Sequence, residues 1–235
     1  MNAIFTLQHN EQFYLPKWIK YYSEFFSMND MYILAHNCTG ITNNILQDAE
    51  DNGINIIELT TDEIFNHDWL TSTVHEMQRE LLGRYDYVVF TDCDEFIVPT
   101  NCRLDEFLDK ATEEAYRCEG FDCIGDNIYP NPRFFNKTLI TRVPLNYENG
   151  YHSVTKELPV NKDLILFHIH RLDYTEALER NKRLASEKWD NKAIEQNLGR
   201  QNSLLDIDAF DRWYYEGKDI AFRSPLFNGL LEVIC

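Results

Sequence analysis

The chain has 235 residues, of which 44% are apolar and 14% aromatic, and it carries a formal net charge of −17 with a sequence pI near 4.7. This length suits one large α/β domain or one domain with an appendage, and the aromatic content argues against disorder. A chain this negative is repelled by nucleic-acid backbones and anionic lipid, which disfavours a general nucleic-acid-binding function.

No segment of the sequence suggests export or membrane insertion. No apolar stretch approaches the roughly 20 residues that a membrane-spanning helix needs. The first residues, MNAIF, lack the basic region that precedes the apolar run of a secretory signal. The six cysteines include no C-x-x-C pair, so we expect reduced thiols in a cytoplasmic protein.

Predicted strands alternate with predicted helices in the first half of the chain. Apolar and β-branched runs predict strands at residues 3–7, 31–35, 54–59 and 87–90. Apolar residues at helical spacing predict a helix after each strand, at residues 15–25, 42–52, 70–81 and 104–111. With short, right-handed connections, this order gives a parallel sheet covered by helices on both faces.

The second half follows a different pattern. Strands without intervening helices are predicted at residues 121–129, 138–143 and 164–168. They indicate a mixed or antiparallel extension of the sheet. Thr175 is expected to N-cap a helix that runs to about Trp189, and a last helix is expected near residues 207–214. We expect residues 1–190 to form the main domain and residues 191–235 to form a helical extension packed on it.

An acidic motif follows the fourth predicted strand, in the segment YVVFTDCDEF. Asp92 and Asp94 are two residues apart, so their side chains point the same way if the strand continues. Open α/β sheets bind ligands at the carboxyl ends of their strands, and paired carboxylates suit Mg²⁺ or Mn²⁺ carrying a phosphorylated substrate. The alternative is a turn whose acids cap the next helix.

Histidines gather at the ends of predicted strands. Five of the seven do so: His9, His36, His152, His168 and His170. A histidine beside two aspartates is a suitable third ligand for Mn²⁺, although an ordinary polar role is the alternative for each of them. His168 and His170 share one face of their strand by alternation.

Basic residues are scarce, so their positions matter. Arg171 follows His170 directly, and its guanidinium is the expected donor to a diphosphate. Arg133, Lys137 and Arg142 are expected to be surface charges.

Four segments in chain order carry a resemblance to a known family: QHNE with LPKWI (residues 8–19), YILAHN (residues 32–37), residues 78–96, and residues 138–152 with 166–171. Together they resemble the GT-A-fold glycosyltransferases, most closely the family 2-like group with an Asp-x-Asp-Glu-Phe core. The resemblance spans roughly residues 3–189. It implies an α/β, GT-A-like (Rossmann-like) three-layer fold with a mostly parallel central sheet and an antiparallel or mixed extension in the second half.

The resemblance also implies a site. A nucleotide-diphosphate sugar would bind across the first strands, with Mn²⁺ or Mg²⁺ on its diphosphate, held by Asp92, Asp94 and His168. The expected nucleotide-sugar contacts are Asn10, Glu11, His36, Asn37, Gln78, Asp92, His170 and Arg171. Two departures from the family's pattern are the missing acid in residues 36–40 and the missing Lys-Ser pair after the late histidine.

The implied function is metal-dependent transfer of a sugar to an acceptor hydroxyl by a hexosyltransferase-like enzyme, with inversion, the acceptor being a glycan, a lipid-linked molecule or a protein. Inversion needs a carboxylate base near the acceptor hydroxyl. Asp126 is the first candidate and Asp173 the second, the alternative for Asp126 being an Asp-Asn turn.

Two other functions fit parts of the sequence. A phosphatase of the haloacid-dehalogenase type also has Asp-x-Asp after an apolar strand, with the first aspartate as nucleophile. That motif normally has Thr or Val where Phe96 stands, and lies near the N-terminus, whereas three strand–helix units come first here. The other alternative is a non-catalytic sugar- or partner-binding domain of the same fold.

Overall fold

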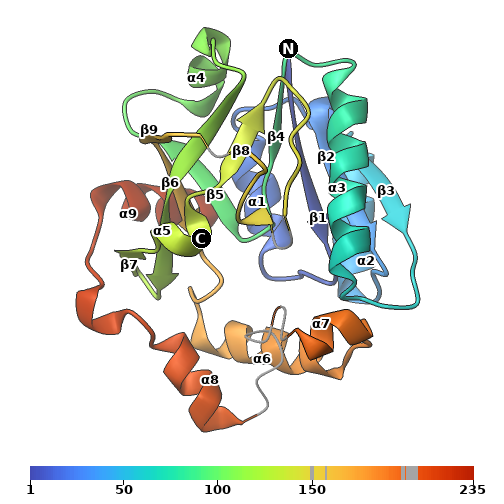
Figure 1. Ribbon diagram of the computed structural model, residues 1–235, viewed down its shortest axis with the longest axis vertical. Helices are drawn as coiled ribbons and strands as arrows, with labels where there is room; N and C mark the ends of the chain where they lie inside the picture. Colours follow the sequence, from blue (N-terminus) through green and yellow to red (C-terminus); the bar gives the residue numbers. More distant parts are fainter. Residues whose placement is uncertain (149–150, 157, 197–198, 200–205) are drawn as a thin grey trace.

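The computed structural model describes all residues except 149–150, 157, 197–198 and 200–205. Within the described residues, one sheet of nine strands has the order β3-β2-β1-β4-β8-β6-β9-β5, with β7 beside β6. Helices cover both of its faces, which gives three layers (Figure 1). The three-layer α/β class expected from the sequence is confirmed.

The first four strands form the parallel half of the sheet. They are β1 (Asn2–Gln8), β2 (Met31–His36), β3 (Asn55–Leu59) and β4 (Tyr87–Phe90), each parallel to its neighbour. Alternate residues of β1 enter two cores. Ile4 packs with the helices α1 (Leu15–Tyr22) and α2 (Ile41–Asp51), whereas Phe5 packs with α3 (His67–Leu82) on the other face. β1, β2 and β4 are largely buried on both faces, which explains their apolar runs, whereas the edge strand β3 is only half-buried.

The second half extends the sheet with mixed pairing, as predicted. Its strands are β5 (Glu95–Pro99), β6 (Ala115–Ile124), β7 (Asn127–Pro130), β8 (Thr138–Thr141) and β9 (Val160–His168). β8 pairs antiparallel with both β4 and β6, and β9 is parallel to β6 and antiparallel to β5.

One strand prediction was wrong, and one strand was not predicted. The single strand expected at residues 121–129 is part of a hairpin, because the chain reverses at Gly125 and Asp126 between β6 and β7. Gly125 has a φ of +58°, which a tight turn needs and glycine adopts without strain. β5 was not predicted as a separate strand. It begins at Glu95, directly after a turn that contains Asp94.

The remaining helices lie around the mixed half and the carboxyl edge of the parallel half. They are α4 (Leu104–Lys110), α5 (Pro132–Phe135), α6 (Tyr174–Ser186), α7 (Asn191–Glu195), α8 (Ile207–Tyr214) and α9 (Pro225–Ile234), with short 3-10 turns at Met28–Asp30 and Lys218–Ile220. α6 and α7 cross the ends toward which β1 and β2 run (Figure 1). Asp173, rather than the expected Thr175, caps α6.

The last helix, α9, was not predicted, and its apolar side packs into the same core as α1. The division at residue 190 stays a prediction. In the described part of the chain, no helix is long and apolar enough to cross a membrane. All six cysteines have free thiols.

Candidate functional site

The Asp-x-Asp motif lies in the turn that joins β4 to β5. β4 ends at Phe90, so the strand does not continue through the two acids and their side chains point to different partners. Asp92 faces Lys137, with Oδ2 3.4 Å from Nζ. Asp94 is buried and faces other residues than Asp92 does, among them His168.

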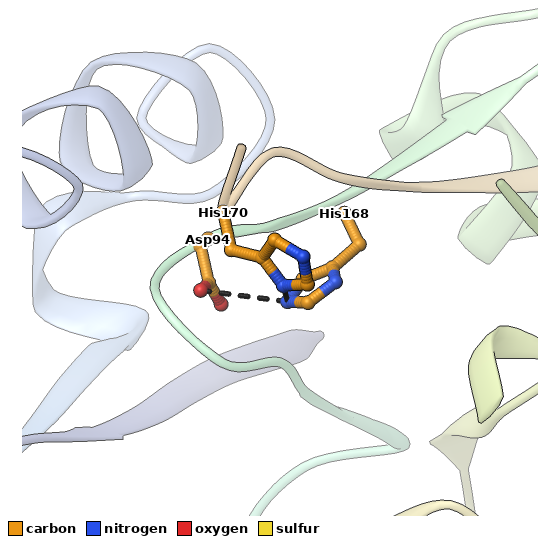
Figure 2. Close-up of side chains that lie close together, drawn as sticks. All are labelled: Asp94, His168 and His170. Atoms are coloured by element: carbon orange, nitrogen blue, oxygen red, sulfur yellow. Dashed lines mark hydrogen bonds and ion pairs between the residues drawn. The ribbon is translucent and has the colours of Figure 1, made fainter. Parts of the chain in front are cut away.

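Asp94, His168 and His170 form a compact cluster, in which one potential ligand atom of each lies within 4.8 Å of the others. His168 Nε2 is 3.4 Å from Asp94 Oδ2 and 3.0 Å from His170 Nδ1. Figure 2 shows both imidazole rings beside the Asp94 carboxylate. His168 ends β9, and His170 lies in the turn that follows; the two side chains meet on one side, as the sequence predicts. His170, expected as a nucleotide contact, therefore stands in the cluster where Asp92 was expected.

Asp122 lies behind the two histidines. Its Oδ1 is 3.7 Å from His168 Nδ1 and 3.5 Å from His170 Nε2, the ring nitrogens that point away from Asp94. Carboxylates in this position orient histidines that bind metals. Asp122 is the partner of His168 in the pairing of β6 with β9, so the sheet register places it here. A lone acid between the apolar residues Phe121 and Cys123 was a sequence signal that the predictions did not use.

Arg171 holds Asp122 in place through an ion pair. Its Nη2 donates to Asp122 Oδ2 at 2.6 Å and also to the Tyr129 hydroxyl. Its Nη1 donates to three backbone carbonyl groups, those of Trp213, Tyr214 and Glu216. Arg171 is 1% exposed. These buried contacts differ from the diphosphate contact predicted for it.

The cluster holds a proton at neutral pH. Burial opposes a charge on His168, but the carboxylates of Asp94 and Asp122 outweigh it and raise the pKa of His168 to about 9. Burial alone would raise the pKa of Asp94, yet Arg180 and His168 hold it well below its usual range. Burial, helped by the charge of His168, holds the pKa of His170 well below its usual range. A protonated His168 next to a neutral His170 follows from these directions.

Arg180, from α6, makes two contacts in the site that the sequence did not predict. Its Nη1 donates to Asp94 Oδ2 at 2.8 Å, and its Nε donates to Glu11 Oε1 at 2.9 Å. Arg183 also approaches Glu11 Oε1, at 3.6 Å. The partners of Arg180 lie 86 and 169 residues away in the chain, so no local spacing could reveal them.

Lys137 was expected on the surface, but it is 1% exposed. Its Nζ lies 2.6 Å from Glu95 Oε1 and 3.4 Å from Asp92 Oδ2. The first of these contacts neutralises the buried charge of Glu95. Burial, with the nearby acids Glu95 and Asp94, raises the pKa of Asp92 to about 7 despite the charge of Lys137. A third of the Asp92 side chain remains exposed, so solvent weakens this effect.

Three predicted nucleotide contacts lie at the carboxyl ends of β1 and β2. The Asn10 amide oxygen accepts from the backbone N–H of Thr39 at 2.8 Å. Asn37 exchanges hydrogen bonds with the backbone of Thr61. His36 contacts the Thr61 hydroxyl at 2.6 Å, and burial lowers its pKa to about 4. These side chains hold the loops of the parallel edge together, at the edge where the sequence places them.

Gln78 lies on the face of the sheet that α3 covers. Its amide oxygen accepts from the backbone N–H of Leu145 at 2.7 Å, and its amide nitrogen donates to the Tyr147 hydroxyl. These contacts fix the segment after β8, which differs from the nucleotide contact predicted for Gln78.

The two candidate bases occupy a turn and a helix cap. Asp126 lies at the tip of the β6–β7 hairpin, where its side chain is 54% exposed and pairs with Arg223 at 2.9 Å. Asp173 Oδ1 accepts from the backbone N–H of Glu176 at the start of α6. Both positions match local structural roles, and their roles as bases stay predictions.

The described part of the surface includes a larger and a smaller hollow. The larger, of about 460 Å³, lies beside the starts of β2 and β3, lined by residues that include Tyr32 and Asn55. The smaller, of about 200 Å³, is lined by Glu11, Tyr14 and Arg180, among others. Ligands of open α/β sheets bind at the carboxyl ends of the strands, so position favours the smaller hollow over the larger one.

No protein-family model matches this chain, and no curated protein matches it. Solved structures similar to it include S. aureus TarS 1-349, at 12% identity and a TM-score of 0.43, over 99% of this chain and 79% of that chain. A putative glucose-1-phosphate thymidylyltransferase from Bacillus anthracis is similar over 92% of this chain and 83% of that chain, at 9% identity and a TM-score of 0.39. Glucosyl-3-phosphoglycerate synthase from Mycobacterium tuberculosis, solved with Mn²⁺, UDP-glucose and phosphoglyceric acid, is similar over 52% of this chain and 43% of that chain, at 15% identity and a TM-score of 0.33. Likeness this distant transfers no activity to this chain.

Proposed function

We propose that this chain is a metal-dependent glycosyltransferase that moves a sugar from a nucleotide-diphosphate sugar to an acceptor hydroxyl, with inversion. The observation that carries the proposal is the meeting of Asp94 with His168 and His170 after β4. Asp94, the second acid of the Asp-x-Asp motif, meets two histidines at and just after the end of β9, and His168 lies 74 residues after Asp94 in the chain. In an α/β sheet this edge is where a phosphorylated substrate binds.

The residues present fit a divalent transition metal. One carboxylate oxygen and two imidazole nitrogens face one another, and Asp122 supports both rings from behind. Two nitrogen ligands favour Mn²⁺ over Mg²⁺, which takes oxygen ligands. When bound, such a metal stabilises the charge that develops on a leaving nucleoside diphosphate.

The other site residues have proposed roles around the donor. Asn10, His36 and Asn37 form the parallel edge that would face the base and ribose, and Asp92 stays partly exposed beside the cluster. The carboxylate that accepts the proton of the acceptor hydroxyl is proposed to be Asp126, with Asp173 second. The acceptor is proposed to be a glycan, a lipid-linked molecule or a protein.

A thermal-shift screen of nucleotide sugars, with and without Mn²⁺, tests this function. One nucleoside diphosphate is expected to raise the unfolding temperature strongly only when Mn²⁺ is present, because the metal joins the diphosphate to Asp94. Asp94→Ala should remove the metal dependence, whereas Asp109→Ala, an exposed acid on α4, should keep it. Equal stabilisation in a chelator would contradict the metal assignment.

Turnover separates the proposal from its alternatives. Sugar released to water from the stabilising donor supports a transferase. Phosphate released from phosphomonoesters without any nucleotide sugar would identify a phosphatase. Tight donor binding with no turnover would identify a binding domain.

A further inference from the structure

The candidate metal site already contains a positive charge that belongs to the chain. Arg180 donates to Asp94 Oδ2, the same oxygen that faces His168 in the cluster. Its side chain is 22% exposed, and its guanidinium lies 5.0 Å from the centre of the Tyr14 ring. The guanidinium is therefore held on three sides, by two carboxylates and an aromatic ring.

A divalent ion and this guanidinium compete for one carboxylate oxygen. Both are cations, and placing them on Asp94 Oδ2 together would bring like charges within a few ångströms in a poorly solvated site. The contact with Arg180, together with that of His168, also keeps Asp94 ionised when it is buried. In the metal-free site the negative charge of Asp94 is therefore already balanced, whereas an open metal site would lack such a counter-charge.

We propose that Arg180 is the resident cation of this site, which holds Asp94 and Glu11 when no metal is bound and must leave Asp94 before a divalent metal binds. Arg180 would then set the metal affinity of the chain. This inference depends on the metal site of the proposed function.

The surroundings offer Arg180 a second position. Glu176 stands one helical turn before it on α6, and both line the hollow of about 200 Å³. A glutamate four residues before an arginine is the favourable orientation for a helical ion pair. Glu11 would keep a partner after the move, because Arg183 already approaches its Oε1 at 3.6 Å.

Direct titration with Mn²⁺ tests the proposal, with the free ion followed by electron paramagnetic resonance and the full chain first stripped of metal. Arg180→Gln removes the competing charge and is expected to bind Mn²⁺ about tenfold more tightly than the wild type, the effect of one charge-assisted hydrogen bond. Lys182→Gln is the matched control, since Lys182 is exposed on the same helix and pairs only with Glu179 among the ion pairs of the described residues. It should bind Mn²⁺ as the wild type does.

The outcomes separate the two proposals. If the wild type and Arg180→Gln bind Mn²⁺ with equal affinity, or the variant binds it more weakly, the metal site stands and the role of Arg180 is wrong. If neither binds Mn²⁺, the metal site itself is wrong and the inference fails with it. Should Arg180→Gln not fold, Arg180→Met carries the test, because methionine keeps an unbranched side chain without the competing charge. That variant is expected to bind Mn²⁺ more tightly than the wild type, and an affinity equal to or below that of the wild type would overturn the inference.

Discussion

His168 and His170 are two imidazoles that meet nitrogen to nitrogen, 3.0 Å apart, with a carboxylate on each side. Metal ions bind neutral imidazole, whereas His168 carries a proton up to a pH near its pKa of about 9. Metal binding therefore has to release that proton, which makes the affinity depend on pH.

We expect the affinity for Mn²⁺ to rise roughly tenfold per pH unit between about pH 7 and pH 9, and to level off above. The slope follows from the pKa of His168, raised to about 9. Competition titrations under argon at pH 7, 8 and 9 measure it. His168→Gln should bind more weakly with a flatter profile, and a wild-type affinity that does not change with pH would rule out proton release.

Stability of the metal-free protein should show the opposite trend. The raised pKa of His168 means that the folded state holds its proton more tightly than the unfolded state does. This contribution is fully present below about pH 6.5, the unfolded value, and is lost as the pH rises through about 9. Urea denaturation in a chelator, across this range, should give a falling free energy of unfolding, and the fall should be smaller in Asp94→Asn.

Lys137 and Glu95 form a buried pair whose two members can be removed separately or together. Lys137→Met leaves Glu95 buried without a counter-charge, which should lower the free energy of unfolding by about 3–5 kcal/mol. Adding Glu95→Gln removes that charge, so the double variant should recover most of the loss. Chemical denaturation measures both, and a double variant as unstable as the single one would show that the pair is not the cause.

At the scale of elements, β6 packs tightly against α5 at Gly120. A Cβ added at Gly120 would lie 2.0 Å from the backbone carbon of Phe135. The Phe135 ring in turn lies 4.1 Å from that of His168. The packing of β6 against α5 is therefore connected to the candidate site through the ring of Phe135.

Gly120→Ala should push α5 away from β6 and lower the free energy of unfolding by about 2–3 kcal/mol, the range for overpacked cores. Gly229→Ala is the matched control, because Gly229 lies in α9 with nothing within 4 Å of an added Cβ. Alanine in an open helical position should stabilise the chain by about 0.5–1 kcal/mol. Thermal unfolding of the two variants measures the contrast, and equal effects would contradict the packing argument.

Sequence patterns predict a strand or helix well when its burial leaves a regular pattern of apolar residues in the sequence. In the parallel half β1, β2 and β4 are largely buried on both faces, and apolar or β-branched runs located all four strands, including the half-buried edge strand β3. The β6–β7 hairpin was missed because its apolar strands hide a two-residue turn at Gly125. α9 was missed although its buried residues Phe227, Leu230 and Ile234 have helical spacing, a signal that the predictions did not use.

The candidate site was predictable only where its residues follow strands. Asp94, His168 and His170 stand at strand ends, where alternation and topology apply. Arg180 lies in the middle of a helix, and its partners depend on how α6 crosses the sheet. The contacts of Arg171 likewise depend on the C-terminal part of the chain, which packs against β6.

The net charge of the whole molecule affects the stability of its fold. With 39 acidic and 22 basic residues, 39 − 22 gives the net charge of −17, and self-repulsion opposes compactness. Raising NaCl from low concentration to about 0.3 M should raise the unfolding temperature by about 2–4 °C, which corresponds to about 1 kcal/mol in a chain of this size. Scanning calorimetry measures it, with KCl as the control for ion-specific effects, and a fall with salt would show that surface ion pairs outweigh the repulsion.

The groups around Asp94 come from the start, middle and last third of the chain, since Glu11, Asp122 and Arg180 all contribute. During synthesis the carboxylate of Asp94 leaves the ribosome long before the guanidinium that neutralises it. An incomplete chain that ends before α6 would lack Arg180, one of the two cationic side chains that face this acid, and would keep only His168. The full set of site residues therefore exists only after α6 has been synthesised.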